Sequence, residues 1–564
     1  MSVTKSLKVA VYAAACAMPI MMTSGPGTAR AETPAPTSFK SAAEALLTAS
    51  FPADGPGAAV IVTRGGRTLY SSGRGLADLE TRLPITPDTA FKLGSIVKQF
   101  TAATVLQLVA EGKIGLDNPI SRFFPDFPQP GGSATIGQLL NHSSGIQDFS
   151  KIPGFMGSEP TMRPNSTADL LAVTRSRPSP SEPGHRWEYN NGGYVVLGAI
   201  IEHVTGTAWH EAISDRIARP LGLKSLTYAA TGESDPARAR GYSLQGGQQL
   251  PARGVHMSVA HAAGGLVGSA RDLAKWADAL HGGRVVTADL YREMIQPARL
   301  ADGSTQPYGF GLRLQELRGR KALVHGGSGR GIDTDSIYLP SEDLFVAVLA
   351  NSDDPATDPS TLTRRLAAIA LGEPFPSFTR ADVPIVQVEP LFGSYRLASG
   401  GAFEFFGRDG KFYMMRGENQ MEALPGGDDR FFFGPDVLTW VRFVRQANGA
   451  HLLEVHEVSA AQPERAVRAG PPTPPLAIAA AVLQSYVGTY ATEGPVVTVA
   501  LAENGSLTIA PAGQPPLPMR PVSETEFRVD AAGFRVVFHR EEGDVNHLTL
   551  HRGARELHGR RSGN

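Results

Sequence analysis

The chain has 564 residues, a length that predicts about three or four domains. Hydrophobic residues make up 42% and charged residues 19%, which is typical of a soluble globular protein with a large core. The formal net charge is −1 and no block of Lys and Arg stands out, so neither a nucleic-acid partner nor a membrane-surface partner is expected.

The first 31 residues are predicted to be a secretory signal peptide. Lysines precede an apolar run from Val9 to Met22, and Ala29-Arg30-Ala31 has the small-x-small pattern of a cleavage site, with the cut after Ala31. No later apolar run approaches the ~20 residues that would span a bilayer. We therefore expect an exported protein, periplasmic or secreted. The only cysteine, Cys16, lies inside the signal; its lipidation is an alternative that the preceding residues match poorly.

Residues 32–372 are predicted to form one domain of helices and an antiparallel sheet. One β-hairpin is expected near its start, around a glycine turn, and another near its end. Strands at both ends of this segment, with helices between them, favour a single sheet backed by a helical cluster. We expect its core to be separate, so that a chain ending near Leu371 still folds. The expected strands are Ala58–Thr63, Thr68–Ser72, Ser336–Leu339 and Leu344–Ala350, and the expected helices are Ala42–Ala49, Ile96–Val109 and Ser360–Leu371.

Two strand-rich modules are predicted after residue 372. A proline-containing linker over 373–389 precedes the first module, at 390–459, and a second linker over 460–480 precedes the other, at 481–564. Three sequence matches between the modules carry the same offset, which chance would rarely produce. We therefore expect two copies of one small antiparallel module, closed or nearly closed like a barrel to hide its edges. The matches pair Phe392–Tyr395 with Val487–Tyr490, Asp409-Gly410 with Asn504-Gly505, and Arg442–Arg445 with Val537–Arg540.

The segment Ser95-Ile96-Val97-Lys98 carries the strongest chemical signal and opens the helix expected over Ile96–Val109. Residues three apart lie on the same face of a helix, so the hydroxyl of Ser95 can meet the amine of Lys98. This helix is apolar on most sides, so we expect it to be buried centrally. Burial lowers the pKa of a lysine, and a neutral lysine can take the proton of Ser95 to make it a nucleophile. The spacing alone occurs by chance about once or twice in a chain of this length.

A second segment, Tyr189-Asn190-Asn191, lies in a Gly-rich stretch. The phenol of Tyr189 could relay a proton between the serine and the leaving group, particularly as a phenolate beside the lysine ammonium. Asn191 could orient Lys98 and hydrogen-bond a substrate amide, because its side chain both donates and accepts. Taken alone, such a segment is more often a turn with a packed aromatic ring.

A third segment, His325-Gly326-Gly327-Ser328, is predicted to end a short strand. We expect the substrate to lie against the backbone at Gly327, where no Cβ obstructs it. The N–H of Ser328 could join the N–H of Ser95 in an oxyanion hole, and His325 would border the pocket as a titratable wall. On its own, the segment is more typical of a Gly-rich turn with an exposed histidine.

In this order, the three segments resemble the motifs Ser-x-x-Lys, Tyr-x-Asn and Lys/His-x-Gly of the penicillin-recognising serine hydrolases. That family includes class C β-lactamases, D,D-peptidases, esterases and D-aminopeptidases. The resemblance covers roughly residues 40 to 372 and implies an α+β, β-lactamase/transpeptidase-like catalytic domain that acts through an acyl-enzyme. Shorter matches are Asp117–Pro119, Leu139–Gly145, Ala263–Leu266, Asp272–Lys275 and Tyr308–Gly311. The expected catalytic residues are Ser95, Lys98 and Tyr189, and the expected substrate-binding residues are Asn191, His325, Gly327 and Ser328.

The two β-modules narrow the choice within the family. A catalytic domain followed by two such modules is similar to the three-domain D-aminopeptidases, which favours an amidase or peptidase acting on a small molecule or short peptide. Modules beside the cleft would narrow it and exclude bulky β-lactams. His325 stands where many β-lactamases carry lysine, and a neutral histidine is a weaker anchor for a carboxylate. A serine esterase and a D,D-carboxypeptidase or β-lactamase-type enzyme remain as alternatives.

Two other classes of function are less favoured. Metal catalysis lacks support, because no His-Glu-x-x-His occurs and the histidine pairs lack a recognisable ligand spacing. Neither a metal nor an organic cofactor is therefore expected. A penicillin-binding-like receptor that has lost turnover is the non-enzymatic alternative, and three intact motifs argue against it. The sequence leaves the oligomeric state open.

Overall fold

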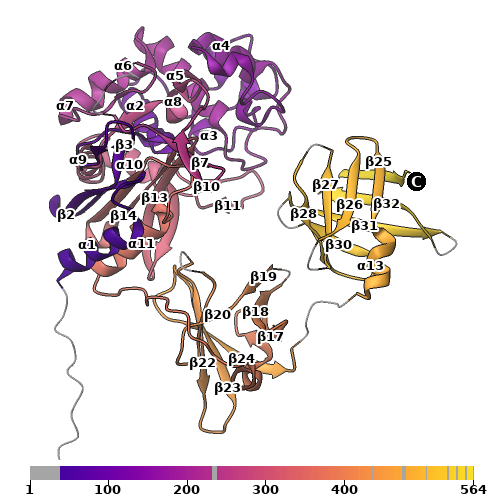
Figure 1. Cartoon of the computed structure of the whole chain (residues 1–564). Coiled ribbons are helices and arrows are strands. Elements are labelled where there is room, and N and C mark those ends of the chain that lie inside the picture. The colour runs from indigo at the N-terminus through magenta and orange to yellow at the C-terminus, as the bar shows by residue number, and fades with distance from the viewer. Residues whose placement is uncertain are drawn as a thin grey trace, which may run out of the picture.

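The computed structural model describes residues 38–562 apart from short gaps at 232–234, 236–237, 418, 435–436, 473–477, 503–504, 513, 530–531, 542–543 and 553–554. The predicted signal peptide, with Cys16, lies outside the described residues. Figure 1 shows a helix-rich part, coloured indigo to salmon, followed along the chain by two strand-rich parts in orange and yellow. This combination confirms the predicted α+β class.

A six-stranded antiparallel sheet forms the centre of the helix-rich part, in the order β12-β13-β14-β15-β1-β2. Strands from the two ends of this part pair with each other, so that Ala58 in β1 lies opposite Ala350 in β15. Both predicted hairpins and their union in one sheet are therefore confirmed. The strands are β1 Ala58–Arg64, β2 Arg67–Arg74, β12 Arg313–Leu317, β13 Arg320–Gly329, β14 Ile332–Leu339 and β15 Leu344–Ala350.

The sheet is covered by helices on both faces. Side chains alternate along a strand, and in β1 Ala59 and Ile61 pack into the larger helical cluster while Val60 and Val62 pack against α1 and α11. None of the helices within the described residues is both long and apolar enough to cross a membrane. The helices are α1 Phe39–Ser50, α2 Val97–Ala110, α3 Ile136–Leu140, α4 Thr167–Arg175, α5 Asn191–Thr205, α6 Trp209–Ile213, α7 Arg219–Leu221, α8 His261–Gly264, α9 Ala270–His281, α10 Ala288–Met294 and α11 Pro359–Ala370.

Helix α2 is buried along nearly its whole length, as its apolar sequence predicts. The ring of Phe100 stacks on that of Trp276 at 4.2 Å between centroids, which ties α2 to α9. A 3-10 turn at Gly94–Ile96 leads into the helix, so Ser95 stands at its N-terminal end. The helix stops just before Gly112, whose φ of +70° favours glycine.

Short strands connect the helices to the central sheet. The backbone N–H of Leu93 donates to the carbonyl oxygen of Leu266, and this bond fixes the chain that enters the Ser95 turn to the strand β9. The short strands are β3 Leu76–Asp78 with β4 Leu83–Pro84, β5 Phe91–Lys92 with β9 Leu266–Gly268 and β6 Thr227–Tyr228, β7 Tyr242–Gln245 with β8 Gln248–Pro251, and β10 Ala298–Arg299 with β11 Thr305–Gln306.

The rest of the chain forms two nine-stranded antiparallel sheets, each nearly closed and each preceded by a short helix. The first has the order β19-β18-β17-β16-β24-β23-β22-β21-β20, and the second repeats it as β28-β27-β26-β25-β33-β32-β31-β30-β29. Each sheet encloses its own hydrophobic cluster. Two copies of one barrel-like module are therefore confirmed, whereas the residues at which the domains begin and end stay a prediction.

The first module comprises α12 Ile385–Val388 and the strands β16 Gly393–Leu397, β17 Ala402–Arg408, β18 Lys411–Arg416, β19 Asn419–Glu422, β20 Leu424–Pro425, β21 Arg430–Phe432, β22 Trp440–Arg445, β23 His451–His456 and β24 Glu464–Gly470. The second comprises α13 Ala480–Tyr486 and the strands β25 Gly488–Thr492, β26 Val497–Leu501, β27 Leu507–Pro511, β28 Leu517–Pro518, β29 Arg520–Pro521, β30 Glu526–Val529, β31 Phe534–Glu541, β32 Asp544–Arg552 and β33 Arg555–Arg561.

The first module docks on the central sheet at the turn between β12 and β13. The N–H groups of Arg318 and Gly319 donate to the carbonyl oxygens of Val458 and Ser459. Leu438 is 7% exposed and belongs to the hydrophobic cluster under α1 and α11, and Val458 packs against that cluster. The expectation of a fully separate core before Leu371 is therefore wrong, because residues of the first module complete it.

This contact lies at the opposite end of β13 from Ser328. Ser328 is eight positions beyond Arg320 along an extended strand, which corresponds to roughly 25 Å. The hydrogen bonds that dock the first module are therefore distant from the third motif, and the expectation that the two modules narrow the cleft stays a prediction.

We expect a chain ending at Leu371 to fold less stably than one ending at Gly470. Removing the first module exposes apolar surface under α1 and α11, and each buried side chain of this size is worth about 2 kcal/mol. A loss of that order lowers the melting temperature by roughly 2–4 °C for a domain of this size. Calorimetry on the two shortened chains and the full chain measures the difference. Equal melting temperatures would show that the docked side chains contribute nothing to the core.

Candidate active site

The three sequence motifs meet at the junction of α2, α5 and β13. Ser95 occupies the 3-10 turn before α2, and Lys98 lies one turn further along. Asn191 is the first residue of α5, where the side chain of Asn190 caps the helix by accepting the N–H of Gly193 at 2.9 Å. Ser328 lies near the end of β13.

The amine of Lys98 lies at the centre of the site and is fully buried. Its Nζ is 3.0 Å from Ser95 Oγ, 2.9 Å from Asn191 Oδ1 and 2.9 Å from the carbonyl oxygen of Ala263. Burial lowers the pKa of Lys98 to about 7, while the charge of Asp148 raises it and that of Arg313 lowers it. The amide and carbonyl oxygens can accept both N–H groups of a neutral amine, so its lone pair is left facing the hydroxyl of Ser95.

Tyr189 lies beside this pair as a neutral phenol. Burial raises the pKa of Tyr189 to about 12, although a hydrogen bond with Ser95 and the charge of Arg313 lower it. The Nζ of Lys98 is 4.8 Å from the centroid of the Tyr189 ring. These surroundings disfavour the phenolate considered from the sequence. They favour a phenol that gives its proton only when another group replaces it.

Gly327 accommodates the turn of the nucleophile. A Cβ at this position would stand 2.3 Å from the carbonyl oxygen of Leu93 and 2.7 Å from the backbone nitrogen of Ser95. The hydroxyl of Thr334 lies 3.1 Å from the oxygen of Leu93 and 3.0 Å from that of Gly327, so it joins β13 to the same turn. The space that a Cβ at Gly327 would fill holds this turn, and the expected contact of the Gly327 backbone with substrate stays a prediction.

His325 does not border the pocket, contrary to the sequence-based expectation. Its side chain is 1% exposed, Nε2 lies 2.8 Å from the hydroxyl of Tyr308, and Nδ1 lies 2.8 Å from the carbonyl oxygen of Gly326. Because a carbonyl only accepts, Nδ1 carries the proton and Nε2 accepts from the phenol. Burial and the nearby Lys98 charge lower the pKa of His325 to about 3. The ring is therefore neutral and fully engaged.

Three functional neighbours were missed by the sequence analysis. The Oδ2 of Asp148 accepts the backbone N–H of Asn191 at 3.1 Å, and the buried carboxylate raises the pKa of Lys98. The guanidinium of Arg313 lies 5.4 Å from the Tyr189 ring. His142 packs against Tyr189 with ring centroids 4.4 Å apart. His142 lies within one of the short family matches and Arg313 lies just after another. Nothing in the pattern of those matches indicates a contact with Tyr189.

A cavity of about 650 Å³ opens beside Ser95. Ser95, Asn191 and Ser328 line it, so the two residues whose N–H groups are expected to form an oxyanion hole border the same space. Phe149, Met257 and other apolar side chains form part of its wall. The described residues contain no group of three or more His, Cys, Asp or Glu side chains placed to hold a metal ion. The arrangement suits attack by a serine hydroxyl on a carbonyl carbon, assisted by a neutral amine.

Residues 47–371 match the family model described as Beta-lactamase. The D-aminopeptidase of Gluconobacter oxydans is 28% identical to this chain over 429 residues, which cover 74% of each protein. The D-aminopeptidase of Brucella anthropi is 30% identical over 347 residues, which cover 60% of this chain. That match spans 63% of the Brucella protein, less than two thirds of its length.

Solved structures show the same similarity. The octameric penicillin-binding protein homologue from Pyrococcus abyssi superposes with a TM-score of 0.51 at 26% identity, covering 73% of this chain and 96% of its own. The D-amino acid amidase from Ochrobactrum anthropi SV3, complexed with D-phenylalanine, superposes with a TM-score of 0.50 at 28% identity. This second match covers 59% of the present chain and 100% of the amidase.

We expect a fluorophosphonate probe to label Ser95 alone, because only this serine has a buried amine within hydrogen-bond distance in the described part of the chain. Intact-mass analysis should show one adduct, and peptide mapping should locate it at Ser95. The surface variant Ser176→Ala should label normally. Retention of the adduct in Ser95→Ala would contradict the assignment.

The rate of acylation should rise with pH through about 7. Lys98 can accept a proton only when neutral, and its pKa is lowered to about 7, so below that pH kcat/KM should fall about tenfold per unit. A pH–rate profile between 5 and 9 measures this.

Lys98→Arg is the matched control for that profile, because a guanidinium keeps the positive charge but cannot accept a proton. The variant should lose about 10²–10⁴ in kcat/KM, nearly as much as Lys98→Ala. Near wild-type turnover by the arginine variant would mean that Lys98 acts only through its charge.

Proposed function

Because this chain belongs to the β-lactamase family of serine hydrolases, we propose that it hydrolyses amide or peptide bonds on the carboxyl side of D-amino acids. The reaction proceeds through an acyl-enzyme on Ser95. The observation that carries the proposal is the buried amine of Lys98, hydrogen-bonded to Ser95 and Asn191 and with its pKa lowered to about 7. The N-terminal pattern supports export of a mature chain that begins at Glu32.

Acylation follows from the contacts of Ser95. Lys98 takes the hydroxyl proton while Ser95 Oγ forms a bond to the carbonyl carbon of the substrate. The N–H groups of Ser95 and Ser328 stabilise the negative oxygen of the tetrahedral intermediate. The carbon–nitrogen bond then breaks, and the leaving amine takes a proton from the phenol of Tyr189. The Lys98 ammonium, 4.8 Å from the centroid of the Tyr189 ring, then returns its proton to the Tyr189 oxygen, which leaves the amine neutral again.

Deacylation repeats these steps with water as the nucleophile. Tyr189 takes a proton from the attacking water while it passes its own phenol proton to Lys98, and the acid is released as the Lys98 ammonium returns that proton to Ser95 Oγ. Tyr189 suits this role because its raised pKa keeps it protonated in the resting enzyme, so it loses a proton only while another arrives.

The choice of D-amino acid amides is supported by the names of the relatives and by His325. Two relatives from different genera are D-aminopeptidases, and a similar structure is a D-amino acid amidase. His325, buried and neutral between Tyr308 and Gly326, offers no charge to the carboxylate of a β-lactam. The same machinery cleaves esters, so a serine esterase is the alternative that the test must separate.

We expect the mature enzyme to cleave D-alanine p-nitroanilide faster than the L-isomer, by roughly 10–200-fold in kcat/KM, as differential binding of one small group allows. A chromogenic cephalosporin should be hydrolysed poorly. Absorbance assays measure all three rates, with Ser95→Ala as the blank. If the enzyme ignores D-amino acid amides but cleaves short acyl esters, it is an esterase. If it prefers peptides ending in D-Ala-D-Ala, it is a D,D-peptidase.

A further inference from the structure

The cavity beside Ser95 is basic. Its lining includes Lys92, Arg253 and Arg330, whereas none of the described residues that line it is Asp or Glu. Within the described part of the chain, neither Arg253 nor Arg330 has a hydrogen bond or ion pair with another residue. Both side chains belong to exposed residues, so each guanidinium has all its N–H groups available.

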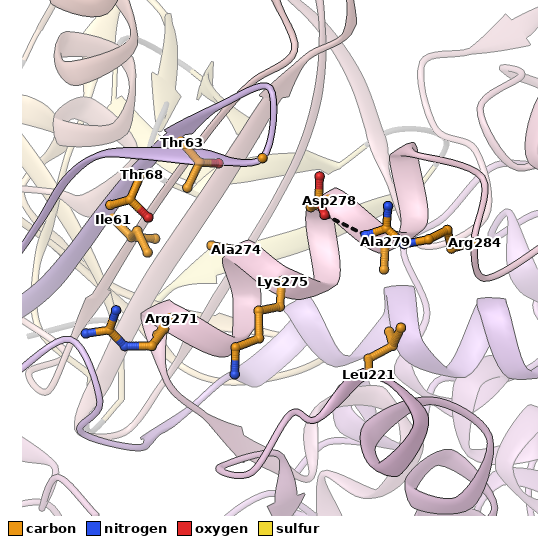
Figure 2. Close-up of a pocket in the computed structure, with 11 residues that line it drawn as sticks. Ile61, Thr63, Thr68, Leu221, Arg271, Ala274, Lys275, Asp278, Ala279 and Arg284 are labelled. Carbon is orange, nitrogen blue, oxygen red and sulfur yellow. Dashed lines mark hydrogen bonds and ion pairs between the residues drawn. The ribbon is translucent and has the colours of Figure 1, made fainter.

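A second cavity shows that cations on a cavity wall of this protein do not generally lack carboxylate partners. It is lined by residues of α9 and of the β1–β2 hairpin, and its cations are Arg271, Lys275 and Arg284 (Figure 2). Each of these three cations is paired with a carboxylate. The guanidinium of Arg284 donates a hydrogen bond to Asp278 at 2.5 Å (Figure 2).

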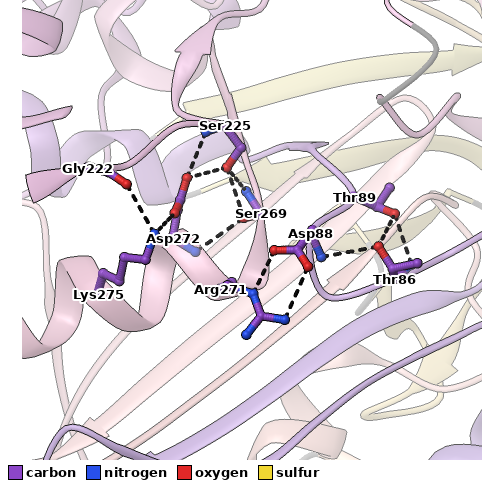
Figure 3. Close-up of polar contacts among 9 residues, drawn as sticks. All are labelled: Thr86, Asp88, Thr89, Gly222, Ser225, Ser269, Arg271, Asp272 and Lys275. Carbon is purple, nitrogen blue, oxygen red and sulfur yellow. Dashed lines mark hydrogen bonds and ion pairs between the residues drawn. The ribbon is translucent and has the colours of Figure 1, made fainter. Parts of the chain in front are cut away.

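The other two pairs are shown in Figure 3. Arg271 binds both oxygens of Asp88, at 2.6 and 3.1 Å, and Lys275 bonds Asp272 at 2.8 Å. The positive charge of the second cavity is thus neutralised internally, whereas that of Arg253 and Arg330 is not.

Close packing brings together the two segments that carry the unpaired arginines, and both arginines line the same cavity. Arg330 lies in the turn between β13 and β14, and Arg253 follows β8. A Cβ on Gly254 would stand 3.2 Å from the Cβ of Arg330, so the two segments touch. A Cβ on Gly331 would stand 2.6 Å from the Cβ of Ala252, and the φ of +74° at Gly331 also requires glycine.

The position of Tyr189 indicates which part of a substrate enters the cavity. The leaving amine must lie beside its proton donor, and Tyr189, with Arg313 at its ring, does not line the cavity. Ser95 lines the cavity and Tyr189 does not, so we assign the cavity to the acyl part of the substrate, the part that stays bonded to the attacked carbonyl.

We propose that Arg253 and Arg330 bind a carboxylate on the acyl part of the substrate, so that the enzyme prefers acidic acyl groups such as the side chain of D-glutamate or D-aspartate. The assignment of the acyl part rests on the proposed function. Two guanidinium groups without internal partners can give charge-assisted, bidentate hydrogen bonds to one carboxylate. No carboxylate on the lining competes for them.

The test compares the α-p-nitroanilides of D-glutamate and D-glutamine, which differ in charge and hardly in size. The full mature enzyme should favour D-glutamate by about tenfold or more in kcat/KM, and the preference should shrink as salt rises. Arg253→Gln and Arg330→Gln should each lower kcat/KM for D-glutamate by about tenfold and leave D-glutamine unchanged. Arg284→Gln, from the neutralised cavity, should keep the wild-type ratio.

Two results would overturn the proposal. One is an equal kcat/KM of the wild-type enzyme for the D-glutamate and D-glutamine anilides. The other is an equal loss of kcat/KM for both anilides in the Arg253 and Arg330 variants. Hydrolysis of D-glutamine anilide in either case would leave the proposed function standing. If no D-amino acid anilide is cleaved, the proposed function fails. The charge comparison is then made with the p-nitrophenyl esters of adipate, which keeps a free carboxylate, and of hexanoate, which does not. Loss of an adipate preference in the variants supports the basic site, and equal rates reject it.

Discussion

An amine inside a protein is useful as a base only if burial makes it neutral and its neighbours accept its remaining N–H groups. Lys98 meets both conditions with atoms from three distant parts of the chain: Ser95, Asn191 and the carbonyl of Ala263. The apolar sequence of α2 supplies the burial. The contacts with α5 and α8 explain why these helices must pack closely around it.

The central sheet holds the Ser95 turn in place beside this buried amine. Pairing β1 with β15 brings both ends of this part of the chain together, and helices then cover both faces of the strands. The strand β13 is held against the Ser95 turn through Gly327 and Thr334. The position of the hydroxyl relative to the backbone N–H of Ser328 is therefore set by sheet register and by the lack of one Cβ, and not by a flexible loop.

The sequence was sufficient for features that lie within one element or repeat along the chain. The spacing of Ser95 and Lys98 follows from helix geometry, and the repeated order of the two nine-stranded sheets follows from the constant offset of their matches. Contacts between loops were not predictable, because Asp148 and Arg313 reach the site through tertiary packing alone. His325 could have been placed correctly, since Leu323 on the same face of β13 packs into the helical cluster.

The identical strand order of the two modules is the pattern left when a segment is duplicated and both copies are retained. The two copies differ in sequence at the position through which the first module contacts the catalytic part. Leu438 docks the first module on the catalytic part, and the residue at the equivalent offset in the second module is Gly533, which has no side chain to bury. Among the described residues of the second module, none belongs to the two hydrophobic clusters that flank the central sheet. A substitution in the core of the second module therefore leaves the packing of the catalytic part unchanged, so this copy can vary in sequence without loosening the nucleophile's surroundings.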